Sequence, residues 1–422
     1  MIYCAGPSAF PEDRWQLLCL ADRLEGDGYR AYIPFRDGLD ALYPDPLADD
    51  PTRRQKLARA VFAFNVGRLV RECDAVLFSL NGRVPDEGGL IVTAIAAMTG
   101  IPVVLFKQDH RSAFHGFDNA MIIGLSRTFS AVTRPGQIIR AIAREIEQGS
   151  WNKNAAKLPP AVAAAVDLGL KLTEVLDGQL PLTDGGQAVI IRTILSVYDG
   201  SEWADIQSPA EQPENQQAPG KGDRGRDLVY CSGPLFCPGE VRAMTAIARA
   251  LEDSGRDAYL PHRDGVEAFV MKNTDNYLAN LVRPLVRFFH RLTFAVDVYF
   301  ILKCQALVFN ANGRVPDEGG VVEIGLAFAA GKPVLLYREG LQTTGPDMDP
   351  MIIGAMALAT PAATVDRIPE QAGQINRHLY WPMDLTGETG RRSTHMQSIV
   401  RLGHGAWRIM RRIPFLKPET IF

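Results

Sequence analysis

The sequence has few cysteines and little excess charge. Six cysteines in 422 residues are too few for the disulfide framework of a small secreted protein, and none shows the paired spacing of a zinc site. The formal net charge is only −3, so the composition gives no sign of a nucleic-acid or acidic membrane partner. We therefore expect a cytoplasmic protein with no structural disulfide, no metal ion and no cofactor.

Long uninterrupted hydrophobic runs are also missing. The most apolar window, residues 292–311, contains Asp297, Lys303 and Gln305, and such polar side chains argue against a membrane-spanning helix. The chain opens on a strand-like segment, Met1–Gly6, without the basic stretch that begins a secretory signal peptide. Its length suits roughly two to three globular domains, each large enough to bury a core.

What the sequence does contain is a long internal repeat. NGRVPDEGG occurs at residues 81–89 and again at 312–320. Other segments recur in the same order around it, namely IYCAGP with VYCSGP, GYRAYIPFRDG with GRDAYLPHRDG, GIPVVLF with GKPVLLY, and MIIG with MIIG. The repeat is far longer than the roughly 20–50 residues of a solenoid unit. The chain is therefore predicted to contain two copies of one whole domain.

Each copy alternates short apolar strands with helices. In the second copy, strands are predicted at 228–231, 258–261, 306–310 and 333–337, and helices at about 240–254 and 320–330. Such alternation is typical of parallel βαβ units. Each copy is therefore predicted to be a flavodoxin-like α/β domain with a doubly wound parallel sheet and helical insertions. Ligands of these sheets bind beyond the carboxyl ends of the strands, where the Gly-Pro turn and the NGRVPDEGG loop both lie.

The domain boundaries follow from the composition between and after the copies. The first copy is assigned to residues 1–150 and the second to 227–386. Residues 151–205 have helical apolar spacing and are expected to form a helical connector. Residues 206–226, rich in Pro, Gln, Glu and Gly, cannot bury a core and are expected to be a disordered linker. The arginine-rich segment 387–422 is interpreted as a basic tail with a solvated helical face, or alternatively as a contact for an anionic partner.

The two copies differ just after the shared loop. In the second copy Glu323 follows Asp317 by six residues, about one turn into the predicted helix, where the helix N-terminus stabilises a negative charge. An acidic residue within the apolar run Val321–Leu326 is costly to bury unless it lines a cavity. The alternatives are a capping role for Glu323 and a turn-closing role for Asp317. The first copy has Val92 at the position of Glu323 and is predicted to be catalytically inactive.

Four ordered motifs of the second copy, VYCSGPLF, LPHRDG, NGRVPDEGGVVEIG and DPMIIG, resemble the nucleoside 2-deoxyribosyltransferase family. The resemblance covers most of residues 227–374 and, more loosely, 1–148. It implies that Glu323 is the nucleophile, that Asp317 helps to handle the nucleobase, and that Tyr230 orients the glutamate.

The resemblance also implies residues that bind the substrate. These are Gly233, Pro234 and Phe236 of the turn after the first strand, and the pair Arg263 and Asp264 near the base.

In that family an asparagine reaches into a neighbouring subunit's site and holds the sugar. This position is Asn119 in the first copy and Asp349 in the second. Each copy thus lacks something that the other keeps. The resemblance therefore predicts an intramolecular pseudo-dimer in which Glu323 and Asn119 share one site, with further homo-oligomerisation left open. Gln305 stands where the family usually has an aspartate, which Asp74 keeps in the first copy, and this leaves the choice of base open.

The expected substrates are a 2′-deoxynucleoside and a free nucleobase, with the sugar passing to another base or to water. A neighbouring branch of the fold hydrolyses nucleoside 5′-monophosphates and holds the phosphate with an arginine-containing loop. Residues 231–236 contain no arginine, which favours nucleosides. Two alternative functions stay open. One is a hydrolase of nucleoside 5′-monophosphates. The other is a non-catalytic protein that senses nucleosides or nucleotides, which Val92 and Gln305 favour.

Overall fold

The computed structural model of the chain describes residues 1–43, 50–82, 85–109, 118–149, 151–153, 158–180, 187–206, 227–266, 286–313, 317–340, 348–375 and 394–412. All but one residue of the predicted linker at 206–226 lies outside the described residues, as do parts of both NGRVPDEGG loops. Among the described helices, none is both long and apolar enough to cross a membrane.

Each copy forms a four-stranded sheet in which all pairings are parallel. The first sheet has the order β2-β1-β3-β4, with β1 Ile2–Ala5, β2 Ala31–Tyr32, β3 Ala75–Ser79 and β4 Val103–Phe106. The second repeats it as β6-β5-β7-β8, with β5 Leu228–Ser232, β6 Asp257–Tyr259, β7 Ala306–Asn310 and β8 Val334–Tyr337. The predicted fold class is confirmed, because the strand order is that of flavodoxin-like doubly wound sheets.

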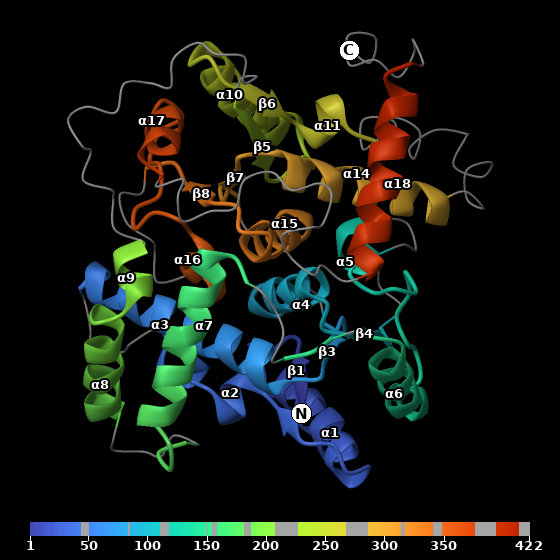
Figure 1. Ribbon diagram of the computed structural model, residues 1–422, viewed down its shortest axis with the longest axis vertical. Coiled ribbons are helices and arrows are strands. Elements are labelled where there is room, and N and C mark those ends of the chain that lie inside the picture. The colour runs from blue at the N-terminus through green and yellow to red at the C-terminus, as the bar shows by residue number, and fades with distance from the viewer. Residues whose placement is uncertain are drawn as a thin grey trace.

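Helices cover both faces of each sheet (Figure 1). The first copy contains α1 Pro11–Gly26, α2 Pro34–Asp37, η1 Asp40–Leu42, α3 Pro51–Glu72, α4 Glu87–Thr99, α5 Ala120–Gly124, η2 Pro135–Gln137 and α6 Ile138–Gln148. The connector forms α7 Pro160–Val175, α8 Gln187–Asp199 and α9 Glu202–Ile206. The second copy contains α10 Pro238–Asp253, α11 Pro261–Asp264, α14 Val286–Lys303, α15 Glu318–Ala329, α16 Pro350–Ala355, α17 Arg367–Gln374 and α18 Thr394–Met410.

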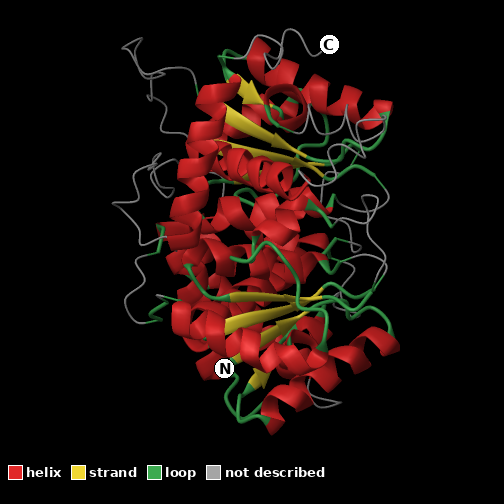
Figure 2. Ribbon diagram, turned by 90° about the vertical axis from the view of Figure 1, so that its right-hand side faces the viewer, coloured by secondary structure: helices red, strands yellow, loops and turns green. Residues whose placement is uncertain are grey.

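The two copies pack against each other through equivalent helices, α4 and α15. Figure 2 shows the two sheets one above the other with helices between them. At the crossing of α4 and α15, a Cβ placed on Gly325 would lie 2.7 Å from the Cβ of Ala94. These two residues occupy the same position in the repeat, so a local pseudo-twofold axis passes between them.

Two reciprocal contacts flank this axis. Gly124 of α5 packs against the ring of Phe294 in α14, and Gly354 of α16 packs against the ring of Phe62 in α3. A Cβ at either glycine would lie within 2.3 Å of the ring, so neither position has room for a larger residue. Each copy thus places its short helix after the fourth strand against the long helix of the other copy.

One hydrophobic core runs through both copies and the connector. Phe62 of α3 meets Phe328 of α15 edge to face, with ring centroids 4.9 Å apart. Trp203 of α9 is only 2% exposed and packs against both rings, at centroid distances of 6.3 and 5.9 Å. The outer faces of the sheets have separate, smaller cores under α1 and α6 and under α10 and α17.

The helices that follow each copy occupy equivalent places. Gly169 of α7 lies against the carbonyl oxygen of Ala63 in α3, and Gly403 of α18 lies against the carbonyl oxygen of Ala295 in α14. The apolar side of α18 is buried, while arginines such as Arg401 face solvent. This helix, which falls within the segment interpreted as a basic tail, is therefore packed into the second copy in the same way as α7 is packed into the first.

Candidate functional site

The second copy holds a buried carboxylate against a buried phenol. Glu323, on α15, is 5% exposed, and its Oε1 accepts a 2.6 Å hydrogen bond from the hydroxyl of Tyr230 on β5. Burial, with the nearby charges of Asp297 and Glu323, raises the pKa of Tyr230 well above its usual value. The phenol therefore stays protonated and donates, which fixes the orientation of the carboxylate.

Asp317 begins the helix that carries Glu323. Its Oδ2 accepts from the backbone N–H of Gly320 at 2.7 Å, which caps α15. Burial raises the pKa of Asp317 to about 6, although the N–H groups of Gly320 and Gly319 pull it down. Asp86 caps α4 in the same way, with a 2.6 Å bond from Gly89. The capping role is therefore common to both copies and does not distinguish the one that carries the glutamate.

The first copy contributes Asn119 next to this helix terminus. Asn119 caps α5, where its Oδ1 accepts from Met121 at 2.9 Å. A Cβ placed on Gly319 would lie 3.3 Å from Asn119 Nδ2, so the amide adjoins the first turn of α15. On the other side of the pseudo-twofold axis, Asp349 lies in the same way against Gly88. Asn119, from the first copy, thus adjoins the first turn of the helix that carries Glu323.

Arg263 and Asp264 form a bracing network. Arg263 donates to Glu252 on α10 at 2.9 Å and to the carbonyl of Ala258 at 2.7 Å, and it pairs with Asp264. Asp264 also accepts from the backbone of Leu260 at 2.9 Å. Equivalent bonds occur in the first copy, made by Arg36 to Glu25, Asp37 and Ala31 and by Asp37 to Ile33. These polar groups are used to tie the turn after the second strand to the domain.

The turn after β5 lies at the carboxyl edge of the sheet. Gly233 has φ of +151°, and a Cβ there would be 2.7 Å from the Cβ of Asn310 on β7, so only glycine fits. Pro234 is buried. Phe236 is 64% exposed, so the described residues do not enclose its ring.

Gln305 and Asp74 lie at the opposite ends of the strands. Gln305 accepts from the backbone of Leu228 at 2.7 Å, at the start of β5. Asp74 pairs with the chain's amino group and with Lys153. Because ligands of such sheets bind at the carboxyl ends, the structure places the Gln305 substitution away from the candidate site.

Sequence reasoning missed a second buried pair beside the first. The hydroxyl of Tyr259 lies 3.3 Å from Oδ1 of Asp297, which is fully buried on α14. The ring centroids of Tyr259 and Tyr230 are 5.2 Å apart. The ring of Tyr259 therefore connects Asp297 to Tyr230, the hydrogen-bond partner of Glu323. In the first copy the equivalent bond joins Tyr32 to a neutral residue, Asn65. The sequence signal for this pair is an acidic residue, Asp297, within an otherwise apolar helical stretch.

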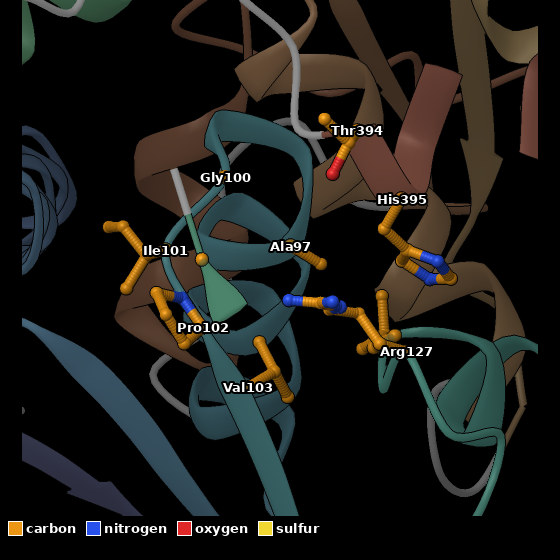
Figure 3. Close-up of a pocket in the computed structure, with 10 residues that line it drawn as sticks. Ala97, Gly100, Ile101, Pro102, Val103, Arg127, Thr394 and His395 are labelled. Carbon is orange, nitrogen blue, oxygen red and sulfur yellow. The ribbon is translucent and has the colours of Figure 1, made fainter. Parts of the chain in front are cut away.

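A separate pocket lies elsewhere, at the amino end of β4 (Figure 3). Its lining includes Arg127 from the first copy and Thr394 and His395 at the start of α18. It is therefore distinct from the Tyr230–Glu323 site at the carboxyl edge. No group of three or more metal-ligating side chains occurs among the described residues.

Comparison with known proteins decides the family. The nucleoside 2-deoxyribosyltransferase family model matches residues 2–123 and 229–357, which together make up more than half of the chain. The chain belongs to this family. The two matched segments are consistent with a tandem duplication of the nucleoside 2-deoxyribosyltransferase domain, as predicted. They contain Tyr230, Asp317, Glu323 and Asn119, but neither the connector helices nor α18.

Individual relatives add little to the family assignment. No curated protein matches the chain. Among solved structures, the glycosyltransferase SnogD from Streptomyces nogalater is similar at 11% identity over 98% of this chain and 99% of that one, with a TM-score of 0.18. A score that low carries no argument about fold or activity. Members of the nucleoside 2-deoxyribosyltransferase family are enzymes, so the match supports an enzyme in general terms.

Proposed function

We propose that this family member cleaves the N-glycosidic bond of 2′-deoxynucleosides and passes the sugar to another base or to water. The observation that carries the proposal is the buried 2.6 Å bond from Tyr230 to Glu323. It holds a carboxylate in one orientation at the carboxyl edge of a parallel sheet, next to Asp317 at the start of the same helix. The first copy has Val92 in place of the glutamate, so the proposal assigns one working site to each chain.

In the first half-reaction an oxygen of Glu323 bonds to C1′ of the sugar. The electron pair of the C1′–N bond leaves with the base, and the transition state carries positive charge on the sugar that the carboxylate stabilises. Asp317 donates a proton to the departing base, because a carboxyl with a pKa of about 6 holds a proton for part of the time near neutral pH. The products are a glycosyl ester on Glu323 and a free base.

In the second half-reaction a nitrogen of another base, or water, bonds to C1′. The C1′–O bond of the ester breaks and Glu323 regains its charge, while the proton of the attacking group passes to Asp317. Two inversions restore the β configuration. Asn119 is assigned to the sugar, so the two copies would act as a pseudo-dimer with one shared site.

Mass spectrometry of protein quenched after mixing with a 2′-deoxynucleoside tests this function. The proposal expects a deoxyribosyl adduct on the peptide that contains Glu323, absent from the peptide that contains Val92. Faster discharge of the adduct by a free base than by water would assign a transferase, and equal discharge would assign a hydrolase. Turnover with an inverted sugar product and no adduct would overturn the covalent mechanism. No turnover of any deoxynucleoside would favour the non-catalytic alternative.

A further inference from the structure

The two copies offer a matched comparison at the first turn of the helix that follows the shared loop. In the first copy, a Cβ placed on Gly89 would meet the ring of Phe78, an oxygen of Asp86 and, at 3.2 Å, the Cβ of Ala5. In the second copy, a Cβ on Gly320 would meet the equivalent ring and the oxygen of Asp317, but also the Oγ of Ser232 at 2.9 Å. The surroundings are alike, and Ser232 adds one hydroxyl to the copy that carries the glutamate.

This hydroxyl is enclosed. Ser232 ends β5 and is 1% exposed, and among the described residues its Oγ has no hydrogen-bond partner. Leaving a buried hydroxyl without a hydrogen bond destabilises the folded protein. The first copy avoids that destabilisation with Ala5, so alanine fits this backbone. The Ser232 hydroxyl destabilises the substrate-free protein and is found only in the copy that carries Glu323. This indicates that it acts during the reaction.

The position of the hydroxyl shows which group it can serve. Side chains on a strand alternate between the two faces of the sheet, so Ser232 lies on the same face as Tyr230, two residues before it. The charged group nearest to Gly320 is Asp317, whose Oδ2 would lie 3.2 Å from the same Cβ. The Oγ of Ser232 and the Oδ2 of Asp317 therefore both lie beside the first turn of α15.

We propose that Ser232 is a positioning residue for Asp317. The Ser232 side chain rotates about its Cα–Cβ bond, so that its hydroxyl donates a hydrogen bond to the Asp317 carboxylate once that group has given its proton to the departing base. The proton on Ser232 is shared and not transferred, so the balance of the first half-reaction is unchanged. This inference rests on the proposed function, in which Asp317 is the general acid.

Among the residues that the structure describes, few other groups can stabilise the charge that appears on Asp317. Glu240 on α10 raises its pKa, and the adjacent Glu318 is itself a buried carboxyl whose pKa is raised to about 7. Lys107, from the first copy, is paired with Asp118. Apart from the backbone N–H groups of α15, a neutral donor such as a hydroxyl can therefore stabilise the new charge at this place.

The first test is the pH profile of kcat for wild type and Ser232→Ala. Alanine is tolerated at the equivalent position of the first copy, so the variant is expected to fold, and thermal unfolding checks this. The proposal expects a loss of about tenfold in kcat. It also expects the alkaline limb of the profile, where Asp317 loses its proton, to move up by about one pH unit. Loss of one hydrogen bond to the charged carboxylate raises its pKa by about that amount. Ser232→Thr, which keeps the hydroxyl, should restore the position of the limb.

A second measurement does not depend on turnover. Carbon-13 NMR titration of labelled aspartate carboxyls, with Asp317→Asn to assign the signal, gives the pKa of Asp317 directly. It should rise in Ser232→Ala and stay unchanged in the control Ala5→Ser, which adds a hydroxyl beside Asp86. An unchanged pKa in Ser232→Ala would overturn the role of Ser232. A raised pKa in a protein with no turnover would sink the proposed function and leave the contact standing.

Discussion

Asp349 of the second copy lies against the backbone of Gly88 in the first, with both carboxylate oxygens 3.2 Å from where a Cβ on that glycine would be. Burial is the main cause that raises the pKa of Asp86, and the negative charge of Asp349 raises it further. Burial also raises the pKa of Asp349, to about 6. At the equivalent place beside α15 the residue is Asn119, which is neutral. The Asp86–Asp349 pair of carboxyls therefore has Asp317 and Asn119 as its counterpart beside α15, where only one of the two residues is acidic.

Replacing this carboxylate is expected to stabilise the protein at neutral pH. A carboxyl whose folded pKa is raised favours folding at low pH, and that advantage is lost as the pH rises from about 4 through about 6. Asp349→Asn should thus increase the free energy of unfolding by about 1–3 kcal/mol at pH 8 and change it little at pH 4. Urea unfolding at the two pH values measures this. An equal gain at both would show that charge is not the cause.

Glu323→Gln should abolish turnover while keeping the fold. The amide oxygen still accepts from Tyr230 but cannot form the ester, so a loss of about a thousandfold to a millionfold in kcat is expected. Val92→Ala is the matched control, because it changes the same helix position in the other copy and should leave kcat within about twofold. Near wild-type activity in Glu323→Gln would assign the nucleophile elsewhere.

Asn119→Ala is expected to weaken substrate binding from the other copy. Loss of one buried hydrogen bond to the sugar should raise KM by about 5-fold to 150-fold, equivalent to about 1–3 kcal/mol, with a smaller effect on kcat. Steady-state kinetics of Asn119→Ala and Asp349→Ala compare the two sides of the pseudo-twofold axis. Equal effects of the two substitutions on KM would contradict a single shared site.

Asp317 should control the alkaline limb of the rate. The general acid must carry a proton, and the protonated fraction falls as the pH rises through about 6. kcat for departure of a base that needs protonation should therefore decline above that pH. Asp317→Asn should remove the limb and lower kcat by about a hundredfold to ten-thousandfold. The corresponding Asp86→Asn should do neither, and a limb that survives in Asp317→Asn would assign the acid to another group.

Much of the fold could be predicted from the sequence, because local patterns and repetition determine it. The strands before the Gly-Pro turns and before the NGRVPDEGG loops are short apolar runs that end in glycine, and the structure has parallel strands there. The equivalence of α7 and α18 was missed. Only a short pattern, Val-x-Leu-Gly at 166–169 and 400–403, marks it, and its meaning lies in two glycines that touch helix backbone.

The candidate site could be predicted only in part. Tyr230 and Glu323 are 93 residues apart, and motif resemblance alone placed them together before the structure showed their contact. Arg263 belongs to the same set of motifs, yet its donors are engaged in a network that both copies share. Whether a polar atom is buried, and whether it has a hydrogen-bond partner, depends on residues that are far apart in the sequence. For this reason Ser232, whose hydroxyl has no partner among the described residues, could not be singled out from spacing.

The packing of Trp203 has a consequence for how the two copies unfold. Its indole packs against Phe62 of one copy and Phe328 of the other, so we expect the two copies and the connector between them to unfold as one cooperative unit. The copy that has Val92 in place of the glutamate is therefore needed for the stability of the other copy. Substitutions that unfold this half are expected to remove activity from the site in the other half, and neither half is expected to fold as a separate protein.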